Sequence, residues 1–348
     1  MASKSSPLAI VPGLALVVAV AIAARYLHGK IPAEVAKLVG DVIVAVALGL
    51  VVGNVIRLPG FVKPGIQFAF RTLLRLAIVL LGATFSLKTA LSIGGRSILM
   101  VVALMTLALL VAHALGRFLE VPGKLSTLIG VGTAVCGNTA ISAVAPVIGA
   151  PDEETSFAIA TNTLFGTAAV FAYPVLGHAL GMADPVFGTW AGTAVNDTSQ
   201  VVAAGFAYSA AAGKVATVVK LTRNLLMGGV ILLMGLLYGR GGGKSVSLAA
   251  RIKQSIPGFV IAFVGMCMLN TFGIVEKLGT IVHRDLGSDA QTAAKFLILV
   301  ALAGVGLGTR FSAMRRIGLR PFWVGLATAL TTSGASYAII HFFGPAGR

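Results

Sequence analysis

Residues 130–142 read GVGTAVCGNTAIS and place a polar cluster inside an apolar run that extends over residues 125–150. In lipid, main chain that leaves the helical conformation must be buried in protein or line a hydrated cavity. Asn138 beside Gly137 suits such a break, and a helix that restarts there presents free N–H groups and the positive end of its dipole. We therefore predict a broken helix with an anion site at its restart. The alternative is that Asn138 and the nearby threonines only join helices by hydrogen bonds.

The composition around this stretch is that of a polytopic membrane protein. Hydrophobic residues make up 57% of the 348 residues and charged residues only 11%, with a mean hydropathy of +0.95. Soluble domains are about 45–50% apolar and about 25% charged. The 43 glycines fit helices that approach closely in lipid. The net charge of +16 comes from basic residues between apolar runs, which is typical of membrane topology and not of nucleic-acid binding.

The number of membrane spans follows from the length of the apolar runs. A spanning helix needs about 20 mostly apolar residues, and on that measure there are about eleven candidates: 8–25, 36–56, 72–88, 97–116, 125–150, 155–178, 186–210, 215–238, 255–273, 290–309 and 321–343. If all eleven cross, a cytoplasmic N-terminus puts roughly twice as many Lys and Arg residues inside as outside. This predicts that the C-terminus lies on the opposite side. The sequence leaves open whether spans 125–150 and 186–210 cross fully or re-enter.

The order of the spans suggests an internal repeat. Residues 1–30 hold an extra helix, and 31–183 and 184–348 form two halves of five spans with opposite topology, as in many secondary transporters. The fold class is therefore an all-α membrane protein with an inverted 5+5 repeat and two broken crossing helices. The breaks are expected in the glycine-dense stretches Gly130–Thr133 and Gly304–Thr309. A second similarity, GTAV at 132–135 and again at 192–195, lies in spans that would run the same way, and indicates two polar sites facing one cavity.

A second polar cluster, Asn196-Asp197-Thr198-Ser199-Gln200, lies between apolar stretches. A carboxylate at membrane depth is costly and is usually functional. Asp197 could carry a coupling proton, ligate a coupling cation or pair with a basic residue. If the span is shifted outward, Asp197 becomes a loop residue.

Five further residues have both a structural and a functional interpretation. Arg310 is expected to set topology more than to hold an oxyanion, and Lys220 and Arg223 are expected to extend to the membrane interface. Asn162 fits packing and cavity lining equally well. Cys136 has no neighbouring His or acid, so it is expected to pack beside the break and not to act as a nucleophile.

These motifs resemble those of the YeiH-like sulfate exporter family. The resemblance is carried by residues 136–141, 196–204, 81–87 and 306–312 and covers about residues 35–343. It implies a transporter of the bacterial inner membrane, with the N-terminus cytoplasmic and the C-terminus periplasmic. It also implies kinship with the cation–proton antiporter and bile-acid symporter type of fold, in which Asn138 would lie at the helix break and Asp197 and Gln200 in the polar pocket. Because Asn196 stands where the family often has a His, Asp197 is the only obvious titrating group.

We therefore expect a secondary transporter of a small anion, sulfate or an organic sulfonate, that works by alternating access. The expected substrate-binding residues are Thr133, Cys136, Gly137, Asn138, Thr139, Asn196, Thr198, Gln200, Thr309 and Arg310, with Asp197 as the coupling residue. No cofactor, metal or nucleic acid is expected; the coupling ion would be H⁺ or Na⁺, and a homodimer is compatible with the sequence. The alternatives are a sodium-coupled symporter of a larger organic acid, a channel, and an intramembrane enzyme, for which five scattered histidines and two lone cysteines supply no constellation.

Overall fold

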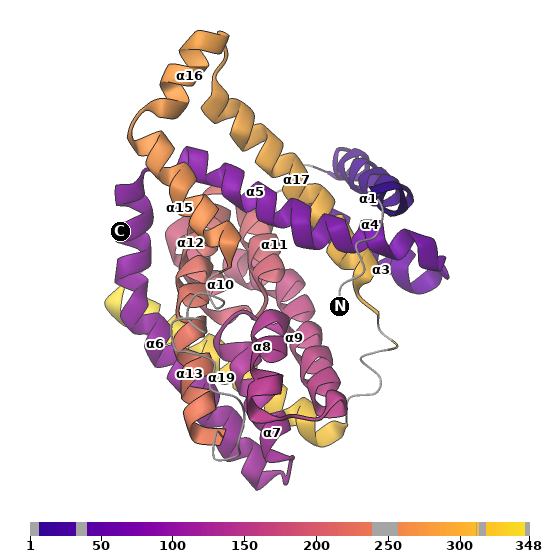
Figure 1. Ribbon diagram of the computed structural model, residues 1–348, viewed down its shortest axis with the longest axis vertical. Helices are drawn as coiled ribbons and strands as arrows, with labels where there is room; N and C mark the ends of the chain where they lie inside the picture. Colours follow the sequence, from indigo (N-terminus) through magenta and orange to yellow (C-terminus); the bar gives the residue numbers. More distant parts are fainter. Residues whose placement is uncertain (1–6, 33–39, 239–256, 311, 313–317, 345–348) are drawn as a thin grey trace. The chain divides into compact units, whose positions relative to one another are not determined.

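The computed structural model describes residues 7–32, 40–238, 257–310, 312 and 318–344 (Figure 1). All regular secondary structure in these ranges is helical. The chain divides into two compact units. Unit 1 comprises residues 1–90, 206–210 and 259–311, and unit 2 comprises residues 91–205, 211–258 and 312–348. The expected linker 239–251 and most of the basic run 310–320 lie outside the described residues.

Unit 1 is built on a long central helix, α17 (Leu286–Gly308), which α1, α3 and α5 contact. The other helices are α1 (Pro7–His28), α3 (Asp41–Val55), η1 (Gly60–Val62), α4 (Lys63–Phe68), the π-helix η2 (Ala69–Leu73), α5 (Leu74–Leu81), η3 (Gly82–Thr84), α15 (Gly258–Thr271) and α16 (Ile274–Val282).

The expected break in Gly304–Thr309 falls at the last residue of that stretch, because α17 is helical through Gly308 and Thr309 is extended. The glycines there serve close packing. A Cβ atom on Gly306 would lie 2.4 Å from the carbonyl oxygen of Val46 in α3, and one on Gly49 would lie 2.5 Å from that of Ala303. Small residues let the two backbones approach to this degree in lipid.

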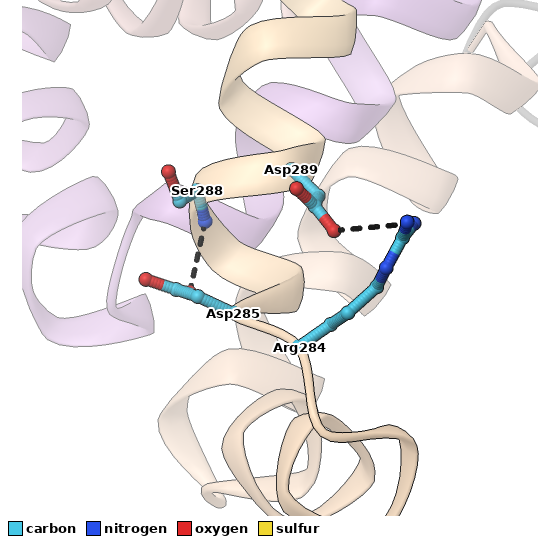
Figure 2. A network of polar contacts seen from close by, with 4 residues as sticks. All are labelled: Arg284, Asp285, Ser288 and Asp289. Carbon is cyan, nitrogen blue, oxygen red and sulfur yellow. Dashed lines mark hydrogen bonds and ion pairs between the residues drawn. The ribbon is translucent and has the colours of Figure 1, made fainter.

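The start of α17 is fixed by a polar turn after the bent pair α15 and α16, whose axes differ by 71°. Figure 2 shows that Asp285 caps α17: its side chain accepts a hydrogen bond from the Ser288 main-chain N–H at 3.0 Å. Arg284 lies 3.9 Å from Asp289 in an exposed ion pair. A capping carboxylate satisfies an N–H group that has no partner inside the helix.

Unit 2 holds the longest helices together with two pairs of short ones. Its helices are α6 (Leu87–Phe118, of which the first turn belongs to unit 1), α7 (Gly123–Ala134), α8 (Asn138–Ile148), α9 (Asp152–Ala179), α10 (Asp184–Ala194), α11 (Thr198–Tyr208), α12 (Ala210–Leu225), α13 (Met227–Tyr238) and α19 (Leu319–Phe343). The adjoining ends of α11 and α12, residues 206–210, belong to unit 1.

The first short pair, α7 and α8, is a hairpin and not a crossing helix. Lys124 near the start of α7 donates a hydrogen bond of 2.7 Å to the carbonyl oxygen of Gly149, directly after α8. Two collinear helices would separate these residues by more than 30 Å at about 1.5 Å per residue. α8 restarts at Asn138, as the polar cluster predicts, but the break lies at Val135–Gly137 and not in Gly130–Thr133, which is helical within α7.

The second short pair, α10 and α11, is also a hairpin. Gly188 and Gly192 of α10 lie against Ala212 and Ala216 of α12, so α10 and α12 run in the same direction. Gly205 of α11 lies against Gly213 of α12, across the turn between them, so α11 runs the opposite way. The start of α10 and the end of α11 therefore both lie beside the start of α12, and residues 195–197 form the tip of the hairpin.

The two hairpins open toward opposite ends of unit 2. α12 and α13 together form a run of 29 residues, Ala210–Tyr238, long enough to span a membrane. The second hairpin opens beside its first residues, whereas Thr127 in the first hairpin bonds Tyr238 at its far end, with 2.6 Å between the hydroxyls. The assumption of eleven full crossings is therefore wrong at spans 125–150 and 186–210.

Six helices among the described residues are long and apolar enough to cross a membrane, or seven if the bent pair α15–α16 counts as one. The six are Leu8–His28, Gly60–Thr84, Ser97–Phe118, Asp152–Ala179, Ala210–Tyr238 and Leu286–Gly308. An all-helical membrane protein is thus confirmed at this coarser level. The division of the sequence at residues 30 and 183 into repeats stays a prediction.

Candidate functional site

The tips of the two hairpins meet inside unit 2. A Cβ atom on Gly137 would lie 3.0 Å from Oδ2 of Asp197 and 2.8 Å from Nδ2 of Asn162. Gly137 has φ +68° and ψ −129°, a conformation that side chains with a Cβ atom rarely adopt. Glycine is therefore required twice at this tip, for the turn and for the approach of the second hairpin.

We expect Gly137→Ala to destabilise the protein by about 1–3 kcal/mol, because the backbone conformation is strained and the methyl group has no room. Gly149→Ala is the matched control. Gly149 also has a positive φ of +61°, but its nearest neighbour, Lys124 Nζ, would lie 3.7 Å from the new Cβ atom, so only about 1–2 kcal/mol is expected. Thermal unfolding of both purified variants checks the difference, and equal costs would mean that the tips do not press on Gly137.

Helix α9 joins the two tips through side-chain hydrogen bonds around Thr163. Asn138 Nδ2 donates to Thr163 Oγ1 at 3.1 Å, and Gln200 Nε2 donates to the Thr163 carbonyl at 3.3 Å. Asn162 Nδ2 donates to Asn138 Oδ1 at 2.9 Å. The amide groups of Asn138 and Gln200, which are 62 positions apart in the sequence, therefore share one residue as partner. Asn162 therefore joins α9 to the first tip, and its role in lining a cavity stays a prediction.

Asp197 is the N-cap of α11. Its Oδ1 accepts hydrogen bonds from the main-chain N–H of Ser199 at 3.0 Å and from the Ser199 hydroxyl at 2.8 Å. Gln200 returns the contact, because its Oε1 accepts from the Asp197 N–H at 3.3 Å. This reciprocal pattern is a capping box. The carboxylate is partly buried, so it lies at the tip and not in a loop outside the unit.

Two buried cations, Lys220 and Arg223 of α12, bind the other side of the tips. The Lys220 side chain is fully buried and Arg223 is 2% exposed, so the prediction that they extend to the interface is wrong. Lys220 Nζ donates to the carbonyls of Val135 at 2.9 Å, of Val195 at 3.0 Å and of Asn196.

The Arg223 guanidinium reaches carbonyls of both hairpins. Nε donates to Ala134 at 3.1 Å and Nη2 to Thr133, while Nη1 donates to Thr193 at 2.6 Å and, at longer distances, to Gly192 and Val195. The last carbonyls of a helix have no partner within it and carry the negative end of its dipole. The cations satisfy these groups at the ends of α7 and α10 together.

The charges at the tips do not balance. The C-terminal ends of α7 and α10 and the N-terminal ends of α8 and α11 meet here, and each contributes roughly half a charge of opposite sign. Their sum is near zero. Lys220 and Arg223 then face one carboxylate, Asp197, and the described residues give neither cation an ion pair. Two basic side chains therefore stand beside one acidic side chain at the tips.

The structure separates the predicted site residues into two groups. Cys136, Gly137, Asn138, Asn196, Asp197, Thr198 and Gln200 lie at the tips, with the Thr133 carbonyl bound by Arg223 and Thr139 exposed beside Asn138. Cys136 is buried, with Sγ 3.5 Å from the sulfur of Met227. Thr309 and Arg310 belong to unit 1: Asn54 donates to the Thr309 carbonyl at 2.9 Å, and Arg310 Nη1 donates to the Gly53 carbonyl. Thr309 follows the end of α17, and a helix restarting after it would fall on residues that are mostly outside the described ranges, so its role stays a prediction.

Sequence reasoning missed Thr163 and Asn224 and misjudged Lys220 and Arg223. Asn224 Nδ2 donates to Thr198 Oγ1 at 3.3 Å. The side-chain Oδ1 atoms of Asn162 and Asn224 are buried with no hydrogen-bond partner among the described residues. An available signal was the KxxRN pattern at 220–224, which places Lys220, Arg223 and Asn224 on one side of a membrane-length helix.

These features define an integral helical membrane protein whose polar centre lies inside a helical unit. The chain belongs to the family described as "Conserved hypothetical protein 698", whose model matches residues 12–325. Similar proteins are a UPF0324 membrane protein of Clostridium tetani, 31% identical over 94% of this chain and 95% of the relative, and one of Agrobacterium fabrum, 34% identical over 89% and 86%. One of Streptococcus agalactiae is 32% identical over 91% and 92%. No solved structure matches the chain.

Proposed function

We propose that this protein is a secondary transporter of a small anion, sulfate or an organic sulfonate, that works by alternating access. The observation that carries the proposal is the meeting of two hairpin tips around two buried cations and a single carboxylate. Broken main chain at membrane depth is typical of transporter binding sites. Two basic side chains beside one carboxylate favour an anionic substrate over a cation.

We infer further that the two hairpins are counterparts of opposite orientation. They open toward opposite ends of unit 2, and GTAV ends the first arm of each at 132–135 and 192–195. Compared with eleven full crossings, two re-entrant hairpins reverse the direction of α9 and leave every other spanning helix as it was. The loops on either side of α9 carry no basic residue, because no Lys or Arg lies between Lys124 and Lys214. The charge asymmetry that favours a cytoplasmic N-terminus and a periplasmic C-terminus in the bacterial inner membrane is therefore unchanged.

The proposed anion site lies at the N-terminal ends of α8 and α11. The main-chain N–H groups of Asn138 and Thr139 have no hydrogen-bond acceptor among the described residues, and Thr139 is exposed. Thr198 and Ser199 are partly buried at the start of the facing helix. Helix N-termini bind oxyanions through such N–H groups. Asp197, beside both, would couple transport by taking up a proton before the anion binds, since the two negative charges repel.

A second candidate is sodium-coupled transport of a larger organic acid. The buried, unpartnered oxygens of Asn162 and Asn224 near the tips favour it. Amide and carboxylate oxygens are suitable ligands for such a hard cation, and buried polar atoms rarely lack a partner altogether.

Thermal stabilisation of the purified protein tests the proposal and separates the candidates. We expect a saturable rise in melting temperature with sulfate, sulfite, thiosulfate or taurine, in choline as well as in sodium salts, because ligand binding to the folded state stabilises it. Asn138→Leu should remove the rise, whereas Ser142→Ala, on an exposed position of the same helix, should retain it. Stabilisation by carboxylates only in sodium would favour the second candidate, and no stabilisation by any anion would contradict both.

A further inference from the structure

Lys220 Nζ occupies a cage of main-chain oxygens. Its three partners are the carbonyls of Val135, Val195 and Asn196. The distances from Nζ to the Val135 and Val195 oxygens, 2.9 and 3.0 Å, are ordinary for an ammonium donor. An ammonium group has three N–H donors, so the cage satisfies every one. The oxygens come from both tips, and none is from a side chain.

The chemistry of the cage is that of a monovalent cation site. Carbonyl oxygens at the negative ends of two helices attract a cation without supplying a full negative charge, much as carbonyl rings replace the hydration shell of K⁺ in channels. A divalent ion would require carboxylates. Among the described residues, the one carboxylate at the tips is that of Asp197, whose Oδ1 accepts hydrogen bonds from Ser199.

We propose that the oxygen cage at the hairpin tips is a binding site for a monovalent cation, and that Lys220 is its tethered occupant. The ammonium replaces a dissociable ion and holds the tips together throughout. It follows that no Na⁺ or K⁺ binds at this cage in the natural protein, and that removing the side chain creates a site for small primary ammonium ions. This inference concerns stability alone and does not depend on transport.

The test is chemical rescue of Lys220→Ala. Propylammonium has the atoms that this substitution removes beyond Cβ, and 1-propanol has similar size without the charge. We expect Lys220→Ala to melt below the wild type in choline chloride and to gain a saturable increase of at least about 3 °C from propylammonium or methylammonium, but none from 1-propanol. The wild type should not respond.

Lys220→Met is the matched control, since its side chain nearly fills the same space and leaves no room for the amine. It should be destabilised and should not respond to ammonium ions. The proposal is overturned if Lys220→Ala is as stable as the wild type, if propanol and propylammonium act equally, if Lys220→Met is rescued as well, or if Lys220→Ala fails to fold even when prepared in propylammonium.

Discussion

Arg223→Met is expected to lower the free energy of unfolding by about 3–5 kcal/mol. The substitution leaves the buried carbonyls of Thr133, Ala134 and Thr193 without their donors. Each unsatisfied group costs about 1–3 kcal/mol, and water that reaches the carbonyls reduces this cost. It also removes one of the two cations that offset the helix C-termini. Methionine fills most of the volume, so loss of packing is a minor part of the effect. Reversible unfolding in mixed micelles measures it.

Two variants calibrate this result. Arg117→Met removes an exposed arginine at the end of α6 and should change stability by less than about 0.5 kcal/mol. Arg223→Lys keeps the charge but loses the planar fork that reaches both hairpins, so it should fall between the wild type and Arg223→Met. A wild-type stability for Arg223→Met would mean that water satisfies these carbonyls and that the arginine does not join the hairpins.

The sequence predicts the first break correctly because two signals coincide there. Asn138 is polar within an apolar run, and Gly137 permits a backbone conformation that other residues avoid. The second tip is signalled in the same way by Asn196–Gln200. The residues at both tips could therefore be identified, and the resemblance to a known family led to the same ones.

The direction of the chain after each break could not be predicted. Two arms of 11 or 12 residues have the same total length and hydropathy whether they continue across the bilayer or turn back. Only a tertiary contact, such as Lys124 with Gly149, separates the two. For the same reason the GTAV similarity does not indicate inversion by itself, since full crossings would make its two copies parallel.

The partners of Lys220 and Arg223 were hidden for another reason. Both side chains bind main-chain carbonyls, which every residue has, so no complementary acid marks the pairing in the sequence. Glycine-dense stretches are ambiguous in a similar way. Gly304–Gly308 looks like a break but serves the contact of α17 with α3, as the spacing of Gly306 and Val46 shows.

Asp197→Asn is expected to abolish gradient-driven uptake in proteoliposomes while leaving the protein folded. An asparagine can still accept the hydrogen bond from the Ser199 N–H and is as good an N-cap as aspartate, so the start of α11 is retained. It cannot take up a proton, so the negative charge that must be neutralised before the anion binds is permanently lost. Uptake driven by a proton or sodium gradient should fall to the level of empty liposomes, with a melting temperature near that of the wild type.

Two companion variants separate the charge of Asp197 from its capping role. Asp197→Ala removes both and should lose about 1 kcal/mol of stability besides transport, whereas Ser199→Ala removes only the hydroxyl contact of 2.8 Å and should retain coupled uptake. Equilibrium exchange of labelled anion requires no net movement of a coupling ion. It should therefore persist in Asp197→Asn if the anion binds at the helix N-termini. Unchanged gradient-driven uptake in that variant would remove Asp197 from the mechanism, because the described residues place no other carboxylate at the tips.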